Sequence, residues 1–335
     1  MRFFTTFLVL ISSPALGAEV PPPIIDVHLH TTPPAEFLPF SPLPSECALP
    51  ERFPAVDPRQ STVLPAYMKI KEPHCGRILQ PVESEEALIA QTAERLEKYN
   101  IFAVSAGPAD RLKTWAERAP GRIIPAGAPE NLMDPDEEAL RQRIEDGGLD
   151  VFAEISAQYM GFGPDDPAME RFWALAEALD RPVGIHMGPS AAGVPALAFS
   201  TYRAGLSNPL ALEEVLLRHP GLRIYVMHAG WPMEGEMIHM LYSYPQLYVD
   251  IAVLNWHLPR AEFHRYLERL IQAGFSDRIL FGSDQMIWPG AIDVAVESIE
   301  SASFLSETQK RDIFYNNAAR FLDLSEQEIA RHHGK

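Results

Sequence analysis

The chain has 335 residues, and 28 Lys and Arg against 45 Asp and Glu give a formal net charge of −17. Hydrophobic residues make up 47% and charged residues 22% of the chain, close to globular averages, which excludes wholesale disorder. The acidity argues against a nucleic-acid partner, because affinity for phosphate backbones depends on Lys and Arg contacts. We expect a soluble globular protein of one large domain or two ordinary ones.

The first 18 residues have the order of a secretory signal peptide. Arg2 precedes an apolar run over 3–11, and small residues follow over 15–18. The apolar run is too short for a membrane-spanning helix. We therefore expect cleavage at the end of this segment and a periplasmic or secreted mature chain, 19–335, with no membrane anchor. An uncleaved N-terminal helix or anchor is the alternative.

Eight short runs that are apolar on both faces follow, as in buried parallel strands. They lie at 24–27, 102–105, 123–126, 151–155, 183–185, 222–227, 247–251 and 278–281. Helix-like patterns separate them, one starting near Glu85 and others opened by Pro at 135, 167, 209, 232, 259 and 289. This alternation predicts a (β/α)8 TIM barrel. An open doubly wound sheet would also alternate, but no G-x-G-x-x-G follows an early strand, so a dinucleotide-binding version lacks support.

Residues 31–83 do not fit this alternation. The segment contains eleven prolines and no sustained periodicity. Because it follows the first strand, it would lie over the C-terminal face of a barrel, where active sites are built. We interpret it as a structureless, lid-like insertion, with a disordered linker as the alternative.

The chain has two cysteines, Cys47 and Cys75, and both lie in this insertion. An exported protein meets an oxidising compartment, which favours their pairing. With no third Cys and no C-x-x-C, they form neither a zinc knuckle nor a redox motif. We predict a disulfide.

Histidines carry most of the chemical signal. His28 and His30 are two residues apart on the first strand, so they share a face. His186 and His228 close the fifth and sixth predicted strands, and Asp284 follows the eighth. Because all strand C-termini meet at one mouth of a barrel, these positions converge on one site. Imidazole with carboxylate suits Zn²⁺ and related divalent ions.

The motifs around these residues resemble the amidohydrolase superfamily, and in particular its amidohydrolase-related (Amidohydro_2, decarboxylase-like) branch. The resemblance covers roughly residues 24–322 without the insertion. It is carried by the runs Gly184-Ile185-His186-Met187-Gly188, His228-Ala229-Gly230, Gly282-Ser283-Asp284 and Tyr315-Asn316-Asn317-Ala318-Ala319-Arg320-Phe321.

This resemblance implies roles for the converging residues. His28, His30 and His186 would be metal ligands, and His228 a ligand or a residue that orients water. Asp284 would be a ligand and the general base. The metal implied is a divalent ion, zinc first, with one or two ions per site.

Glu154 departs from the pattern of the branch, in which many relatives place a Lys or no ligand at the end of strand four. In other branches of the superfamily, including the TatD-like hydrolases, a Glu at this position bridges two metals. A bridging ligand in a binuclear site and a salt-bridged residue outside the ligand set are both open here. Two-metal sites favour hydrolysis.

Several loop residues after strands four to eight are expected near the mouth. Arg203 would hold a substrate carboxylate, aromatic rings would stack on the ligand, and His257 would touch it. The alternative for these residues is loop packing. The rings are Tyr159, Trp231, Trp256 and Trp288.

Other polar residues receive different interpretations. Asp250 ends strand seven, and we expect it to orient loops or ligands and not to bind metal. The histidines at 219, 239 and 264 and the pair at 332–333, in a loose tail, are expected at the surface.

The sequence thus predicts an exported metal-dependent hydrolase that cleaves an amide, lactone or ester bond of a small molecule, with Asp284 accepting the proton of the attacking water. The alternative is a metal-dependent non-oxidative decarboxylase of an aromatic or unsaturated carboxylic acid. A non-enzymatic metal-binding barrel is a third class, which a missing ligand would support. A small-molecule substrate is the only partner expected besides a homo-oligomer, which the sequence leaves open.

Overall fold

The computed structural model describes residues 20–37, 43–53, 59, 75–190 and 201–335. The predicted signal peptide lies outside these residues, and so does much of the insertion. Eight strands form a three-stranded sheet in the order β1-β4-β5 and a five-stranded sheet in the order β10-β9-β8-β7-β6. The strands are β1 (Ile24–His30), β4 (Ile101–Ala106), β5 (Ile123–Ala126), β6 (Phe152–Ile155), β7 (Val183–His186), β8 (Ile224–Met227), β9 (Leu247–Asp250) and β10 (Ile279–Leu280).

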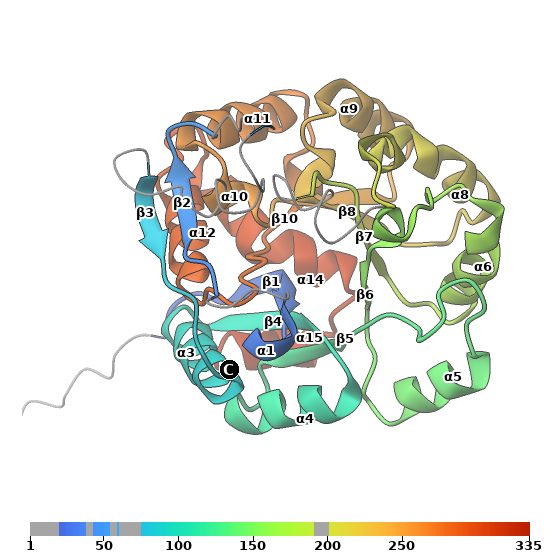
Figure 1. Ribbon diagram of the computed structural model, residues 1–335, viewed down its shortest axis with the longest axis horizontal. Coiled ribbons are helices and arrows are strands. Elements are labelled where there is room, and N and C mark those ends of the chain that lie inside the picture. The colour runs from blue at the N-terminus through green and yellow to red at the C-terminus, as the bar shows by residue number, and fades with distance from the viewer. Residues whose placement is uncertain (1–19, 38–42, 54–58, 60–74, 191–200) are drawn as a thin grey trace, which may run out of the picture.

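Backbone hydrogen bonds join these two sheets at both seams. Between β5 and β6, Ala126 and Val151 form a parallel bridge. Between β10 and β1, Val27 N donates to Phe281 O at 2.9 Å. All strand pairs within the two sheets are parallel. Figure 1 shows the strands around a central axis, so the (β/α)8 TIM-barrel prediction is confirmed.

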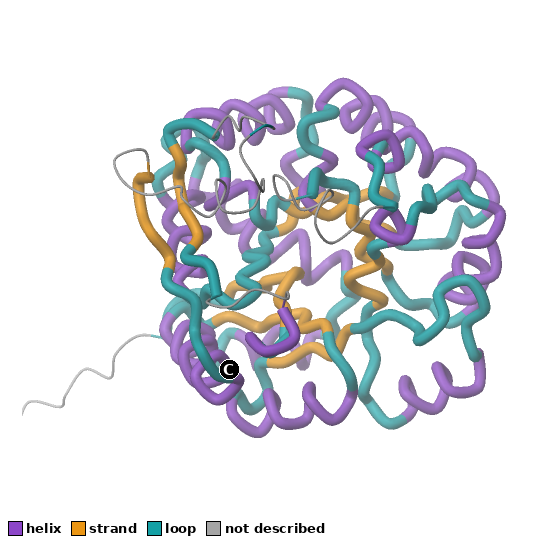
Figure 2. The backbone as a smooth tube through the Cα atoms, viewed as in Figure 1, coloured by secondary structure: helices purple, strands orange, loops and turns teal. Residues whose placement is uncertain are grey.

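Helices surround the strands (Figure 2). Capping side chains begin several of them, and Asp166 and Asn208 cap their helices just before a Pro as predicted. The α-helices are α1 (Pro34–Phe37), α3 (Glu85–Lys98), α4 (Ala109–Arg118), α5 (Glu137–Glu145), α6 (Glu170–Ala178), α8 (Glu213–Arg218), α9 (Glu234–Ser243), α10 (Leu254–His257), α11 (Arg260–Gln272), α12 (Gly290–Glu300), α13 (Glu307–Arg311), α14 (Asn317–Phe321) and α15 (Glu326–His332). Single-turn 3₁₀ segments are η1 (Ala157–Met160), η2 (Pro167–Met169), η3 (Ala204–Ser207), η4 (Pro209–Leu212), η5 (His228–Gly230) and η6 (Ser276–Arg278), and η7 (Asp312–Asn316) is a π-helix.

The apolar core has two layers. An inner cluster fills the barrel with side chains from six of the strands, such as Val27, Tyr225 and Leu280, and from the C-terminal helices. An outer cluster lies between the strands and the surrounding helices. No helix in the described part of the chain combines the length and the apolar composition that crossing a bilayer requires.

The described part of the insertion contains regular structure that the sequence analysis missed. Strands β2 (Glu46–Pro50) and β3 (Cys75–Leu79) pair antiparallel, and a disulfide joins Cys47 to Cys75 with a Cα–Cα distance of 5.6 Å. The hairpin packs against α10 at the rim of the barrel mouth. The expectation of a segment without structure is therefore wrong for these residues, because pairing between two short runs leaves no periodicity in the sequence.

Two histidines expected at the surface are buried instead. His219 is 6% exposed and lies 3.1 Å from each of the carboxylates of Glu170 and Glu177. His332 is 3% exposed and stacks on Phe102 with ring centroids 3.6 Å apart. The tail that carries His332 is thus a docked helix, α15, which begins with a Ser325 capping box.

Candidate metal centre

A register shift in β1 turns its two histidines into the barrel. Ile24 and Leu29 both pack in the outer core, although they are an odd number of residues apart. Strict alternation forbids this, and the pairing of β1 with β4 indeed shifts just before Leu29. His28 and His30 therefore project to the inner side at the strand end. The sequence predicts that they share a face, and the bulge decides which face it is.

A second shift acts on β6. Phe152 and Ile155 are both in the outer core, and the pairing of β6 with β7 is irregular between them. Glu154 is thereby placed on the inner side. His186 needs no such device, because regular alternation along β7 places it opposite the outward residues Val183 and Ile185.

His228 and Asp284 reach the same point from residues just beyond their strands. Both have left-handed backbones, with φ of 57° and 49°. Such φ values are uncommon for residues other than Gly and persist where neighbouring hydrogen bonds stabilise them. Asp250 Oδ1 accepts a hydrogen bond from His228 N at 2.8 Å, and His28 O accepts one from Asp284 N at 2.8 Å. These bonds fix the direction of both side chains.

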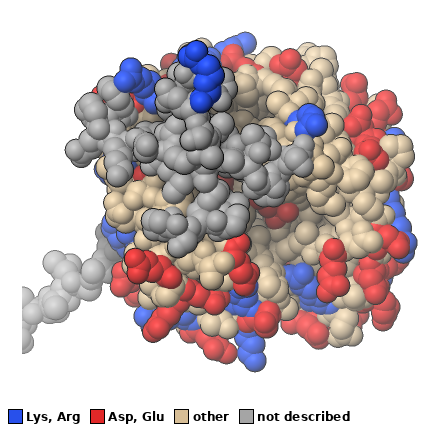
Figure 3. All heavy atoms as spheres, viewed as in Figure 1, with Lys and Arg blue, Asp and Glu red and all other residues tan. Residues whose placement is uncertain are grey.

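The six predicted ligands therefore meet in one cluster at the C-terminal ends of the strands. On one side, His28 Nε2 lies 3.2 Å from His30 Nε2. Asp284 Oδ1 lies 3.0 Å from His30 Nε2 and 3.7 Å from His28 Nε2. Figure 3 shows acidic atoms at the bottom of a hollow on this face, beside the grey residues.

Glu154 connects this group to the other two histidines. Its Oε2 lies 3.7 Å from His28 Nε2 and 3.4 Å from His30 Nε2. Its Oε1 contacts His186 Nδ1 and lies 3.9 Å from His228 Nε2. The two oxygens of one carboxylate thus face two different histidine pairs.

Hydrogen bonds fix the tautomers of two ligands. His28 Nδ1 lies 3.0 Å from Asp250 Oδ2, and His228 Nδ1 lies 3.0 Å from Ala252 O. Both oxygens only accept, so each Nδ1 donates and each Nε2 faces the cluster. Asp250 is fully buried and orients His28 and the loop after β9, the role expected of it.

A divalent cation fits this donor set. Ligands bound to zinc at about 2.0–2.2 Å in a tetrahedron are roughly 3.3–3.6 Å apart, and the separations above bracket that range. His228 Nε2 and His186 Nδ1 are 3.1 Å apart, which two neutral ring nitrogens tolerate only around a shared proton or a cation. The buried His186 Nε2 has no hydrogen-bond partner in the described part of the chain.

The ionisation states of Glu154, Asp284 and His228 also suit a metal. Burial opposes ionisation of Glu154, but His186 and His28 hold its pKa well below the usual value. Burial opposes ionisation of Asp284 as well, but His28 and His30 lower its pKa to about 2. Burial lowers the pKa of His228 to about 4, helped by the charges of His186 and His28. Carboxylates stay ionised and His228 stays neutral, the forms that bind cations.

Comparison with known proteins identifies the chain. The model of the Amidohydro_2 family, described as amidohydrolase, matches residues 25–324. The chain belongs to the amidohydrolase family. This family is metal-dependent, and the match supports an enzyme, either a hydrolase or a decarboxylase.

Solved structures similar to this amidohydrolase-family chain share its fold. One is a probable 2-pyrone-4,6-dicarboxylic acid hydrolase from Acinetobacter baumannii, with a TM-score of 0.57, 12% identity and coverage of 90% of this chain and 99% of that chain. A 2,6-dihydroxybenzoate decarboxylase from Rhizobium has a TM-score of 0.51, 20% identity and coverage of 69% and 87%. An amidohydrolase from Burkholderia multivorans with bound zinc has a TM-score of 0.52, 16% identity and coverage of 90% and 100%.

A curated relative, Protein fluG from Emericella nidulans, is 21% identical over 136 residues. The match spans 36% of this chain and 16% of fluG.

Of the six predicted substrate contacts in this amidohydrolase-family chain, three are not tryptophans: Tyr159, Arg203 and His257. The Tyr159 ring lies 5.1 Å from the His186 ring, edge on, so it belongs to the cluster. Arg203 is exposed in the loop after β7, next to Tyr202, whose ring is 5.2 Å from that of Tyr159. His257, at the end of α10, lies 3.5 Å from Glu46 of the insertion.

The three tryptophans use their indole N–H groups within the protein. Trp231 donates to Glu262, Trp256 to Ser283 O and Trp288 to Pro44 O. Trp256 and Trp288 are also buried. Trp256 and Trp288 thus pack within loops, as in the alternative to substrate stacking, whereas Trp231 is half-buried and its contact with substrate stays a prediction.

Two supporting residues were missed by sequence reasoning. Asp26 Oδ1 accepts from His28 N and from Ser283 N, both at 3.0 Å, and burial raises the pKa of Asp26 to about 6. Gln285 exchanges hydrogen bonds with the backbone of His30 at 3.1 and 2.7 Å. The signal that would have found the first is a carboxylate within an otherwise apolar strand, Ile24-Ile25-Asp26-Val27.

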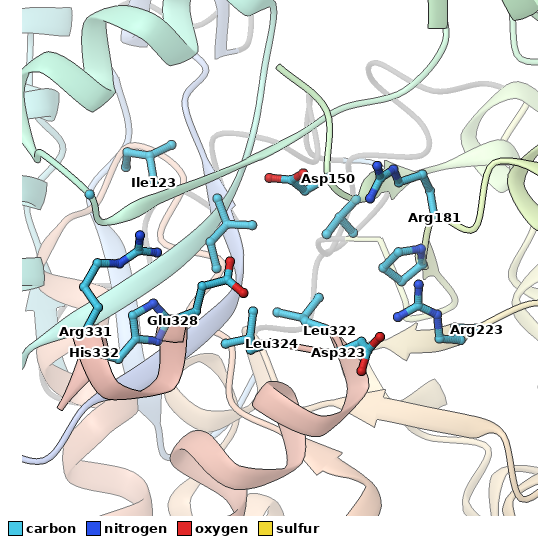
Figure 4. A pocket seen from close by; sticks show the side chains of 14 residues that line it. Ile123, Asp150, Arg181, Arg223, Leu322, Asp323, Leu324, Glu328, Arg331 and His332 are labelled. Carbon is cyan, nitrogen blue, oxygen red and sulfur yellow. The ribbon is translucent and has the colours of Figure 1, made fainter. Parts of the chain in front are cut away.

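A second cavity, of about 300 Å³, lies at the opposite end of the barrel. Figure 4 shows it between the N-terminal ends of β5 to β8 and the C-terminal helices, with Arg181, Arg331 and Asp150 on its walls. Barrels use this end for stability and the other for catalysis. The histidine cluster is therefore the candidate active site of this amidohydrolase-family chain.

Proposed function

We propose that this chain is an exported metal-dependent hydrolase that cleaves a C–N or C–O bond, in an amide, lactone or ester, of a small molecule. The observation that carries the proposal is the position of Glu154, whose two carboxylate oxygens face two different histidine pairs. A carboxylate placed in this way suits a bridge between two ions, and two-metal sites clamp the attacking and the leaving oxygen.

The donor set divides into two sites in this proposal. His28, His30 and Asp284 would hold one ion, His186 and His228 a second, and Glu154 would contribute to both. Zinc is the metal favoured for these nitrogen and oxygen donors. When bound, such ions polarise a carbonyl and lower the pKa of water toward about 7.

The chain's own residues would move the protons and orient the substrate. Asp284 stays ionised at neutral pH and accepts the proton of the attacking water, which it then passes to the leaving group. Burial and the nearby Glu154 raise the pKa of Tyr159, so its hydroxyl keeps its proton beside the cluster. Arg203, exposed at the loop after β7, would receive a substrate carboxylate.

Decarboxylation of an aromatic or unsaturated carboxylic acid is the second candidate function. It is favoured by the similarity in fold to a 2,6-dihydroxybenzoate decarboxylase, whereas the Glu154 geometry favours hydrolysis. A non-enzymatic barrel is disfavoured because no expected ligand type is missing from the cluster.

A substrate screen tests the choice. Zinc-loaded protein is offered aryl esters, lactones, N-acyl amino acids and aromatic carboxylic acids, with release of the carboxylic acid followed by liquid chromatography and carbon dioxide release measured separately. We expect acid release alone, and Glu154→Gln should abolish it while the protein loses about half of its zinc. Carbon dioxide release, or full hydrolysis by Glu154→Gln, would contradict the proposal.

Export is supported by the signal-like residues 1–18 and by the Cys47–Cys75 disulfide, which suits an oxidising compartment. We expect the mature chain in the periplasm or medium, free of nucleic acid and membrane. N-terminal sequencing of the chain from that fraction should begin near residue 19. A chain that keeps Arg2 and sediments with membranes would contradict export.

A further inference from the structure

Gln158, in the 3₁₀ turn η1 just after β6, carries a buried amide with partners at both of its ends. The residue is 2% exposed. Its Nε2 donates to Gly188 O at 3.0 Å, and its Oε1 accepts from Ser207 Oγ at 2.6 Å. Ser207 is buried as well, and its Oγ also lies 3.2 Å from Gly188 O. One side chain therefore joins two points of the connection between β7 and β8.

The partners of Gln158 determine how its amide is turned. Gly188 O is a carbonyl oxygen and only accepts, so the NH₂ group of Gln158 has to face it. The Ser207 hydroxyl then donates its proton to the amide oxygen. Because buried polar groups are costly when they lose their partners, this network resists a displacement of Gly188.

Gly188, two residues after His186, packs directly against the ring of His228. A Cβ at position 188 would lie 2.7 Å from both Cβ and Cδ2 of His228, closer than packed Cβ atoms come. The φ of Gly188 lies outside the left-handed region. Glycine is therefore required at this position by the approach of the ring and not by the backbone conformation.

The His228 ring is bordered along two edges. Ala252 O lies 3.0 Å from Nδ1 on one edge, and Gly188 lies against Cδ2 on the other. Cδ2 is bonded to Nε2, which faces the cluster 3.1 Å from His186 Nδ1. Tyr159, also in η1, places its ring edge-on at 5.1 Å from the ring of His186. The turn η1 thus acts on both histidines of this pair.

We propose that Gln158 is a positioning residue that, through Gly188, sets the place of His228 Nε2 in the metal centre. The inference rests on the proposed function, in which His186 and His228 hold one of two ions. Residues outside the ligand set that orient a ligand change metal affinity by about 10- to 100-fold when they are replaced. Loss of Gln158 releases the Gly188 backbone from the ring, and an added atom at position 188 pushes the ring aside.

Gly188→Ala and Gln158→Leu test the inference from the two ends of this contact. Gly188→Ala removes no hydrogen bond and adds one methyl group against His228, whereas Gln158→Leu removes the bonds of the amide. Zinc binding is measured by competition titration with a chromophoric chelator. We expect each variant to weaken one zinc dissociation constant about tenfold and to leave the other within twofold. Because both changes act through one contact, the double variant should bind zinc no more weakly than the weaker single variant.

Gly205→Ala and Asn317→Leu are the matched controls. Gly205, in η3 of the same connection, has no described atom within 4 Å of an added Cβ. Asn317 on α14 is a fully buried amide whose Nδ2 donates to Ser276 O and Ile279 O, both at 2.8 Å. Ile279 begins β10, so these bonds lie at the end of the barrel opposite the metal centre. Both controls should bind zinc like the wild type, although Asn317→Leu should lower the free energy of unfolding.

Zinc constants of Gly188→Ala within twofold of the wild type, or an equal weakening in Asn317→Leu, would overturn the inference. If Gln158→Leu does not fold, Gly188→Ala decides alone. A wild type that binds only one ion would refute the two-ion function, and a tenfold weakening of that single constant by Gly188→Ala would still support the inference. Absence of any hydrolysis with these differences in affinity intact would likewise refute the proposed function alone.

Discussion

Asp250→Asn separates the orientation of a metal ligand from the general stability of the barrel. Asp250 is fully buried, and its Oδ1 accepts from the backbone N–H groups of His228 and Ala252 while Oδ2 accepts from His28 Nδ1. Asparagine keeps an oxygen for the two backbone donors and places an NH₂ group opposite Nδ1. His28 then has to move its proton to Nε2, the nitrogen that faces the cluster.

The lost hydrogen bond between His28 Nδ1 and Asp250 Oδ2 sets the size of the effect on zinc binding. Loss of a hydrogen bond to a charged group corresponds to about 1.5–3 kcal/mol, and loss of such an outer contact weakens metal binding by about 10- to 100-fold. We expect Asp250→Asn to bind zinc that much more weakly in a competition titration with a chromophoric chelator.

Asp293→Asn is the control for removal of a partly buried charge. Asp293 accepts from Arg95, Lys98 and Tyr99 and belongs to α12, on the outside of the barrel. Asp293→Asn should lower the free energy of unfolding without weakening zinc binding. If Asp250→Asn binds zinc within twofold of wild type, Asp250 does not set the His28 tautomer and the reasoning is refuted.

Four further expectations concern other parts of the chain. Asp284→Asn should retain at least one ion but lose about 10²-fold or more in turnover, the usual scale for a general base. His28→Ala should instead lower the metal content itself. Wild-type turnover by a metal-loaded Asp284→Asn would contradict the role of Asp284 as the base. Verified removal of metal by chelation should lower the melting temperature, because a ligand of the native state adds stability by mass action; an unchanged melt would show that the ion does not hold the mouth together. Replacing Cys47 and Cys75 by Ser should lower the free energy of unfolding by roughly 3–4 kcal/mol in the chain-entropy model, measured by urea unfolding. Free thiols in protein purified from the periplasm would contradict the bond. Burial lowers the pKa of His332 to about 4 in the folded chain, below the ordinary 6.5. The free energy of unfolding should therefore fall by about 2 kcal/mol as the pH decreases from 6.5 to 4. His332→Gln should show less of this loss in urea unfolding at pH 7 and pH 4.5.

The barrel could be predicted because each of its strands is a contiguous apolar run. A strand such as Val183–His186 is buried on both faces, and its sequence is apolar throughout except for the ligand at its end. The hairpin of the insertion lacks this signal. Its strands, Glu46–Pro50 and Cys75–Leu79, are short and far apart in sequence, and each becomes regular only through the other.

Convergence of the ligands could be predicted from strand ends, but their orientation could not. His28 and Glu154 point inward because of register shifts, which place one additional residue in β1 and β6. His228 and Asp284 point inward because of left-handed backbones supported by distant partners. Neither a register shift nor a left-handed backbone produces a periodic pattern that can be recognised in a single sequence. Tertiary contacts likewise decide that His332 is buried, since its partner Phe102 is remote in the chain.

The number and position of the bound metal ions would show whether Glu154 bridges two of them. Zinc per chain is measured in the purified protein, and anomalous scattering at the zinc edge locates the ions in a crystal. We predict two ions about 3.5–4 Å apart, with one oxygen of Glu154 on each. A single ion held by His28, His30 and Asp284, with Glu154 bonded only to His186, would contradict it.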